Sequence, residues 1–284
     1  MIAGARSAAF AAGVAEVGFA WREGASRLAH LYQRDPLRVL FPTPVAGEPP
    51  LAVLVTTSGG LVAGDCLRVA VAVGEDAAAQ VTGAAAEKIY RSDGAVTRVA
   101  QRLTVGAGAW LEFLPPETIL FDGAMLRRET TVSLAAGAGF LGGDILVFGR
   151  RARGERLTRG LLREAWEIWR DGALAWGDAL HIAGDLGPVI DDPACFAAAA
   201  ACATLILAPG GQNPRDFIDA ARDVQSAGAP DGLRAGVTAV GGVLVARWLG
   251  ADPATLRRAY AELAGHLREA AMRLPPRLPR LWYV

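Results

Sequence analysis

The sequence predicts a mainly β protein: a single sheet-rich, β-helix-like domain over residues 1–284, with two α-helices in the C-terminal third. In the first two-thirds, short runs that mix apolar and polar residues near period two follow one another closely, separated by Gly, Pro or Asp turns. In the last third, two segments open with Asn-Pro or Asp-Pro and favour helices. A chain of 284 residues without a long linker can bury one large core.

Strands are expected in the N-terminal part of the chain. Six runs have the pattern: Arg27–Arg34, Leu51–Thr57, Leu67–Val73, Ala95–Val105, Ala109–Phe113 and Thr130–Leu134. A hairpin should follow, because the turn pair Asp171-Gly172 separates Arg163–Arg170 from Ala173–Asp178. The alternative is a helix over Leu161–Trp169, whose glutamates and alanine tolerate one.

The C-terminal third is predicted to hold both helices. Asn213 caps the first, over Arg215–Gln225, and Asp252 caps the second, which runs to about Arg273. Between them, Leu233–Trp248 is predicted to form two strands around a Gly-Gly turn.

One long apolar run precedes these helices. Ala194–Pro209 fits either a helix or a buried strand, and it is shorter than the roughly 20 residues that span a bilayer. We therefore expect it in the core and expect no membrane association.

Composition narrows the function classes. Lys plus Arg and Asp plus Glu number 29 each, so bulk charge gives no reason to expect nucleic acid as a partner. The cysteines Cys66, Cys195 and Cys202 form no CxxC pair, and we expect no disulfide and a packing role for each. No secretory leader pattern opens the chain, which predicts a cytoplasmic protein.

Common catalytic patterns are missing from the sequence. The Gly-rich stretch Ser58–Asp65 lacks the Lys-Ser/Thr pair of a phosphate loop, and no GxSxG or clustered Cys and His ligands occur. Carboxylates beside glycines and strand ends remain, and each is expected to cap a turn or pair with an arginine. A glycosidase-type pair of Glu112 and Glu117 is the enzymatic alternative, although Pro115-Pro116 forces a bend between them.

At these motifs the sequence resembles the urease accessory protein family UreD, also called UreH. The matching blocks run in order along the chain: LYQRDPLRVLFP, SGGLVAGD, AAEKIYRSDG, LEFLPPETILFDGA, GFLGGDILVFGRRARGE, RDGALAWGD and the terminal PRLWYV. Two local departures occur. Gly142-Gly143 stand where the family commonly has Trp or Tyr before the acidic Asp144, and Ala63 replaces the second glycine of the turn before Asp65.

The resemblance implies a non-enzymatic scaffold that binds apo-urease and the UreF-like and UreG-like accessory proteins and helps pass nickel into the urease active site. It implies a β-rich fold, no tightly bound cofactor, and Ni²⁺ in transit through an internal channel. We expect Asp65, Glu87 and Asp144 on that nickel path, because oxygen ligands hold such an ion weakly. The remaining motif residues are expected to hold turns or meet partners: Lys88, Tyr90, Arg91, Glu112, Glu117, Asp122, Arg127, Arg150 and Glu155. Apolar residues near Trp248 and in the Pro-rich tail are further expected partner contacts.

Overall fold

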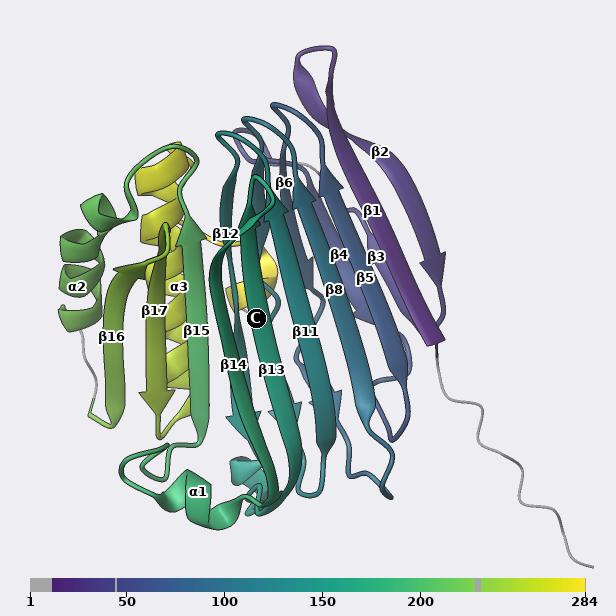
Figure 1. The fold of residues 1–284 in the computed structure, drawn as a ribbon. Coiled ribbons are helices and arrows are strands. Elements are labelled where there is room, and N and C mark those ends of the chain that lie inside the picture. The colour runs from purple at the N-terminus through teal and green to yellow at the C-terminus, as the bar shows by residue number, and fades with distance from the viewer. Residues whose placement is uncertain (1–11, 44, 228–230, 284) are drawn as a thin grey trace, which may run out of the picture.

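The computed structural model describes residues 12–43, 45–227 and 231–283 and arranges them as two stacked β-sheets backed on one side by helices (Figure 1). The seven-stranded sheet has the order β14-β13-β11-β8-β5-β1-β2. Its strands are β1 (Ala12–Arg22), β2 (Ala25–Arg34), β5 (Cys66–Val73), β8 (Thr97–Val105), β11 (Met125–Leu134), β13 (Arg159–Arg170) and β14 (Ala173–Asp185).

The ten-stranded sheet lies behind it and has the order β16-β17-β15-β12-β9-β6-β4-β3, with the short β10 pairing with β12 and β7. Its strands are β3 (Leu37–Leu40), β4 (Leu51–Thr56), β6 (Ala78–Gly83), β7 (Glu87–Ile89), β9 (Trp110–Phe113), β10 (Thr118–Leu120), β12 (Gly139–Phe148), β15 (Ala201–Ala208), β16 (Leu233–Val240) and β17 (Val243–Gly250).

The chain passes back and forth between the sheets, as in a β-solenoid. Between β4 and β13 it enters the two sheets in turn, and neighbouring strands within each sheet are parallel. Antiparallel hairpins flank these coils: β1 pairs with β2, and β13 pairs with β14. The predicted mainly β, β-helix-like class is confirmed.

Three α-helices occur in the described ranges, α1 (Gly187–Asp191), α2 (Ile218–Ser226) and α3 (Pro253–Met272). The two predicted helices correspond to α2 and α3. The Asp252 carboxylate caps α3 by accepting from the Ala254 and Thr255 amides. Asn213 accepts from the Arg215 amide, but a 3-10 turn forms first, so α2 begins at Ile218.

Two hydrophobic cores result. The larger fills the space between the sheets, and the second lies between the outer face of the ten-stranded sheet and α3 with the C-terminal tail. In this second core the ring of Tyr260 stacks on Trp282 with centroids 5.5 Å apart, and Trp248 packs against the same tyrosine at 5.6 Å. The expectation of Trp248 at a partner surface is wrong for its side chain, which is 2% exposed.

Each of the six predicted strand segments overlaps a strand, namely β2, β4, β5, β8, β9 and β11. The hairpin around Asp171-Gly172 is confirmed, and the helical alternative over Leu161–Trp169 is wrong because β13 pairs on both sides. The apolar run Ala194–Pro209 supplies the buried strand β15. No helix in the described parts of the chain is long and apolar enough to cross a membrane.

The three cysteines are free thiols. Buried packing was expected for each, but Cys66 and Cys195 are exposed and only Cys202 is half-buried. Cys66 begins β5 with its side chain on the outer face, where the strand's alternation places it opposite the buried Leu67.

Candidate functional site

A cavity of about 200 Å³ lies between the two sheets. Most of its lining is apolar, but six polar side chains contribute to it: Thr56, Glu87, Lys88, Gln101, Thr118 and Arg128. Of the lining residues, Gly59 and Lys88 are exposed, so the cavity reaches the surface beside β7. The sequence therefore places polar groups inside a sandwich that is otherwise filled mainly by aliphatic and aromatic residues.

Glu87 is the acidic group nearest this opening. It lies on β7, next to the exposed Lys88, and its Oε2 accepts a 2.5 Å hydrogen bond from the Thr56 hydroxyl. Burial raises the pKa of Glu87, while the Thr56 hydrogen bond and the positive charge of Arg128 oppose the rise. The Glu87 carboxylate is thus half-buried, accepts a short hydrogen bond from Thr56, and lines a cavity that opens to solvent.

Arg128 occupies the middle of the sandwich. It projects inward from β11, and its Nε donates to both carboxylate oxygens of Glu164 on β13, at 2.9 and 2.7 Å. Its Nη1 donates to the Thr118 hydroxyl at 2.8 Å. Its Nη2 is buried without a hydrogen-bond partner among the described residues. Burial raises the pKa of Glu164 to about 8, against the opposing charge of Arg128.

Asp144 lies on β12 and is 4% exposed. It accepts a 2.7 Å hydrogen bond from the indole Nε1 of Trp166 on the opposite sheet. Burial raises the pKa of Asp144, and Arg128 opposes that rise. Asp144 and Glu164 also act electrostatically on Cys202, which lines a second hollow of about 480 Å³ between β14 and the strands β15 to β17.

The third carboxylate expected on the nickel path, Asp65, has a different setting. It is buried at the end of the turn before β5, and its Oδ2 accepts from the Val62 amide at 2.9 Å. The same turn joins β7, because Leu61 donates its amide to the Lys88 carbonyl at 2.7 Å. Asp65 therefore holds the turn beside the opening, whereas Glu87 and Asp144 face the interior with Arg128.

Several motif residues pack around Phe121, which follows β10. The ring of Tyr90 meets Phe121 edge-on with centroids 4.8 Å apart, and the Arg150 guanidinium lies 4.0 Å above the same ring. Arg150 also forms an ion pair with Glu155. Arg91 belongs to the isolated bridge with Ala124.

Asp122 continues this cluster. It accepts hydrogen bonds from the amide and hydroxyl of Thr158, both at 2.8 Å, and its own amide donates to Glu155. Despite some burial, these hydrogen bonds lower the pKa of Asp122. The expected turn-holding role of Asp122 and Glu155 agrees with these contacts.

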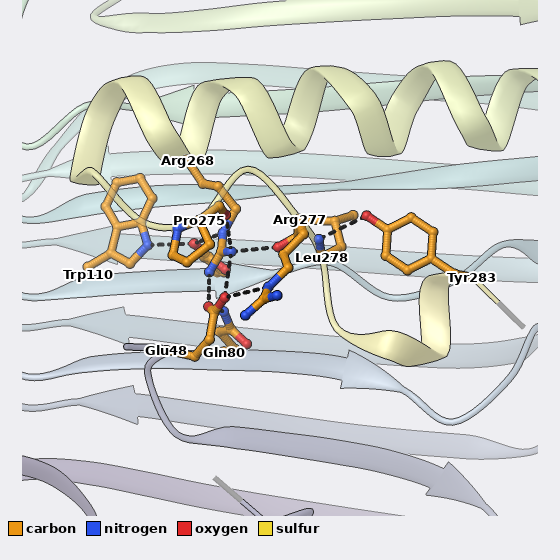
Figure 2. A network of polar contacts seen from close by, with 9 residues as sticks. Glu48, Gln80, Trp110, Arg268, Pro275, Arg277, Leu278 and Tyr283 are labelled. Carbon is orange, nitrogen blue, oxygen red and sulfur yellow. Dashed lines mark hydrogen bonds and ion pairs between the residues drawn. The ribbon is translucent and has the colours of Figure 1, made fainter. Parts of the chain in front are cut away.

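Glu112 is buried on the other side of the ten-stranded sheet, under α3. Its Oε1 accepts from Arg268 Nε at 2.9 Å and from the Trp110 indole at 3.1 Å. Figure 2 shows Arg268 reaching down from α3 to Glu48, 2.6 Å away, and to the carbonyls of the C-terminal tail. Those carbonyls belong to Pro275, at 2.6 Å, and Arg277, at 2.5 Å. The sequence analysis did not single out Arg268.

Glu117 has a separate partner. Its carboxylate lies 3.4 Å from Arg257 of α3, whose Nη2 donates to the Leu281 carbonyl. Glu112 and Glu117 are thus each held by a different arginine of α3. Arg127 differs from its neighbour Arg128, because the strand alternation places it on the outer face of the seven-stranded sheet, half-buried.

The described residues contain no group of three or more His, Cys, Asp or Glu side chains placed to hold a metal ion. The interior site is instead a row of carboxylates from both sheets around one arginine. Carboxylate oxygens in general suit hard divalent cations, and here each of the three carboxylates already accepts a hydrogen bond, from Thr56, Trp166 or Arg128.

Comparison with known proteins gives a consistent result. The family described as UreD urease accessory protein matches residues 11–283. A urease accessory protein UreD of Magnetococcus marinus is 45% identical over 272 residues, 95% of this chain and 93% of its own length. A second, from Methylobacterium sp. strain 4-46, is 41% identical, covering 91% of this chain and 89% of its own.

A third relative extends the match to both ends. The urease accessory protein UreD of Azorhizobium caulinodans is 38% identical over 281 residues and covers 99% of each chain. These identities far exceed what a shared fold alone requires. The chain belongs to the UreD family of urease accessory proteins.

Proposed function

We propose that this protein is a non-catalytic scaffold in urease maturation. In this role it binds apo-urease and UreF-like and UreG-like accessory proteins in the cytoplasm, and it passes nickel toward the urease active site. The proposal rests on the family match over residues 11–283 together with the row of interior carboxylates. Nickel is the cargo here rather than a resident cofactor.

The geometry supports a route through the sandwich. Glu87 stands at the opening beside β7, Arg128 and Glu164 lie further in, and Asp144 follows. Cys202 lines the second hollow, and its pKa is raised by burial and, to a smaller extent, by the charges of Asp144 and Glu164. An ion that enters at Glu87 therefore meets carboxylate oxygens from both sheets before it reaches the hollow near β14.

Weak binding suits a transit path. Burial raises the pKa of both Glu87 and Asp144, so a proton competes with the metal at each position. The positive charge of Arg128 also repels a divalent cation, and Arg128 already forms an ion pair with Glu164. Burial strongly raises the pKa of the Cys202 thiol and keeps it protonated, which disfavours a tight thiolate site.

The hydrolase alternative gains no support from the contacts. Glu112 is 1% exposed and engaged by Arg268 and Trp110, so substrate would first have to displace an arginine. Glu117 is tied to Arg257. A glycosidase requires two carboxyl groups that flank a substrate in an open cleft.

The test is reconstitution. The chain is co-expressed with its cognate UreF-like and UreG-like proteins and apo-urease, the assembly is isolated by affinity purification, and nickel-dependent urease activity is measured. We expect co-purification and an inactive urease when this chain is omitted. Normal activation without the chain would overturn the proposal.

The path is tested separately with Glu87→Gln and Asp144→Asn. Both should keep the complex intact but slow urease activation, since each removes a charged oxygen ligand inside the sandwich. Asp65→Asn should act mainly through stability, because Asp65 holds a turn. The exposed carboxylates Glu75 and Asp223 supply matched controls, as Glu75→Gln and Asp223→Asn. If the controls slow activation as much as the interior variants, the path is elsewhere.

A further inference from the structure

The outer face of the seven-stranded sheet, turned toward the viewer in Figure 1, is rich in arginine. We call it the arginine face. Outward side chains of five neighbouring or nearby strands contribute to it: Arg34 of β2, Arg68 of β5, Arg98 and Arg102 of β8, Arg127 of β11 and Arg163 of β13. Three glutamates also lie on it, Glu16, Glu129 and Glu167.

The strand register places like charges side by side. Arg98 pairs in register with Arg127, and Arg127 pairs with Arg163, so three arginines stand in one lateral row across β8, β11 and β13. Neighbouring strands are about 4.8 Å apart, and like charges directly opposite each other destabilise a sheet. The fold thus carries a repulsive arrangement on this face.

Each carboxylate on the arginine face already has a partner, and only Glu129 is paired with an arginine of the face. Glu16 lies 3.2 Å from His30, and Glu167 accepts from the Trp169 indole at 3.0 Å. Glu129 lies 3.6 Å from Arg163.

Five of the six arginines on the face, all but Arg163, form no ion pair with the described residues: Arg34, Arg68, Arg98, Arg102 and Arg127. Arg127 is half-buried, and most other buried or half-buried arginines meet a carboxylate, as Arg128, Arg257 and Arg268 do.

Two hollows on this face are shaped by the same arginines. One of about 400 Å³ is lined by Arg34, Arg68 and Arg102. The other, of about 330 Å³, is lined by Arg68, Arg98 and Arg127. Arg68 lines both hollows, and each hollow combines three guanidinium groups with one carboxylate, Glu16 in the first and Glu129 in the second.

We infer that the arginine face docks an acidic surface of a partner protein. The residues before Ala12 contain no Asp or Glu, so they cannot supply the missing carboxylates. Nucleic acid is a poorer fit, because Glu16, Glu129 and Glu167 are interspersed with the arginines and would face phosphates. Alternating charges with small apolar residues, such as Ala70 and Ala100, suit a protein surface instead.

This inference rests on the proposed function, since the partner is one of the protein components of the urease maturation assembly. The decisive variant is Arg98→Glu/Arg127→Glu, which reverses two adjacent unpaired charges on exposed or half-exposed positions. The matched control is Arg151→Glu/Arg153→Glu, which changes net charge equally on an exposed turn away from the sheet. Circular dichroism and thermal unfolding are measured first, to verify that both variants are folded.

Affinity for the purified partner proteins and apo-urease is then measured over a range of NaCl concentrations. We expect a loss on the order of tenfold or more for the face variant, a flatter salt dependence, and no loss for the control. Arg98→Lys/Arg127→Lys should retain most of the affinity, because the charge is kept. Equal affinity of the face variant and the wild type, in an assembly that does form, overturns the inference.

A second measurement on the chain alone separates this inference from the proposed function. Poly-L-glutamate and an RNA duplex of similar charge are titrated at low salt. The inference requires that poly-L-glutamate binds the wild type more tightly than the face variant. Preferred binding of the duplex, self-association through this face, or no binding of poly-L-glutamate counts against it, whether or not the assembly forms.

Discussion

The guanidinium of Arg128 and the carboxylate of Glu164 form a two-pronged contact in the middle of the sandwich, with Nε 2.9 and 2.7 Å from the two oxygens. They come from adjacent parallel strands, β11 and β13, whose register pairs them directly. Both side chains are under 10% exposed. Because both groups are buried and each is the main counter-charge of the other, the contact governs both the stability of the fold and the charge of the interior row.

Removing the arginine should be costly. Arg128→Met keeps the volume of the side chain but leaves Glu164 and Asp144 without their positive neighbour. Breaking a buried ion pair typically costs about 3–5 kcal/mol of unfolding free energy. Chemical denaturation at pH 9, above the pKa of Glu164, measures the loss. The double variant Arg128→Met/Glu164→Leu should recover part of it, and a loss below about 1 kcal/mol in the single variant would contradict this account.

Stability should depend on pH through Glu164. Its pKa is about 8 in the folded protein against 4.5 for the ordinary group, so the folded state binds this proton more tightly. The corresponding stabilisation is complete below pH 4.5 and is lost as pH rises through 8. The contribution is at most about 1.4 kcal/mol per pH unit. Between pH 5 and 8, the unfolding free energy of Glu164→Gln, measured with denaturant, should change less with pH than that of the wild type. Identical pH slopes for the two proteins would refute the raised pKa of Glu164.

Arg268 is expected to hold the C-terminal tail against the sheet. Arg268→Met removes its contacts to Glu48, Glu112 and the tail carbonyls, and should lower the unfolding free energy by roughly 3–5 kcal/mol. Limited proteolysis should then cut the chain within the tail that follows α3, C-terminal to Met272. The exposed Arg277, 3.6 Å from Glu48, is the control, since Arg277→Ala should cost under about 1 kcal/mol. Equal protease resistance of Arg268→Met and wild type would show that Arg268 does not hold the C-terminal tail in place.

Gly143 should not accept even a methyl group. A Cβ there would lie 1.9 Å from the Thr204 carbonyl oxygen of β15 and 2.8 Å from the Tyr260 hydroxyl. Gly143→Ala is therefore expected to lower the unfolding free energy by about 1–3 kcal/mol, as overpacking does. Gly236→Ala on β16, with open space around it, should cost less. Thermal unfolding of the two variants decides the matter, and equal melting temperatures would count against the contact.

The sequence predicted best those elements that have local signals. Asp171-Gly172 located the β13–β14 hairpin, and Asp252 located the start of α3. By contrast β12 was missed, because it is buried on both faces and therefore lacks the period-two alternation of a half-exposed strand. Its adjacent glycines Gly142 and Gly143 allow close packing, the first against Phe140 and the Phe113 carbonyl of β9, and the second against β15 and α3.

The residues of the interior site could be predicted only in part from the sequence, for a related reason. Glu87 and Asp144 were named from their motifs, but Arg128 and Glu164 were not. A usable signal existed: Arg128 shares the inward parity of Leu126 and Val132 on its strand. Arg268 gave a weaker signal, because its partners Glu48 and Glu112 lie 220 and 156 positions earlier in the chain. Contacts at such separation leave no local pattern.

That separation also bears on how the protein is made. During synthesis the strands that carry Glu112 leave the ribosome long before α3 does, and α3 supplies the only guanidinium seen to contact this carboxylate in the described chain. Until Arg268 arrives, covering the outer face of the ten-stranded sheet at Glu112 would bury a charge without a counter-ion. The strands that are made first are therefore expected to leave Glu112 in contact with water. Completion of the fold thus waits for the final segment of the polypeptide, and a nascent chain stalled before α3 would present an open, largely apolar sheet face to chaperones.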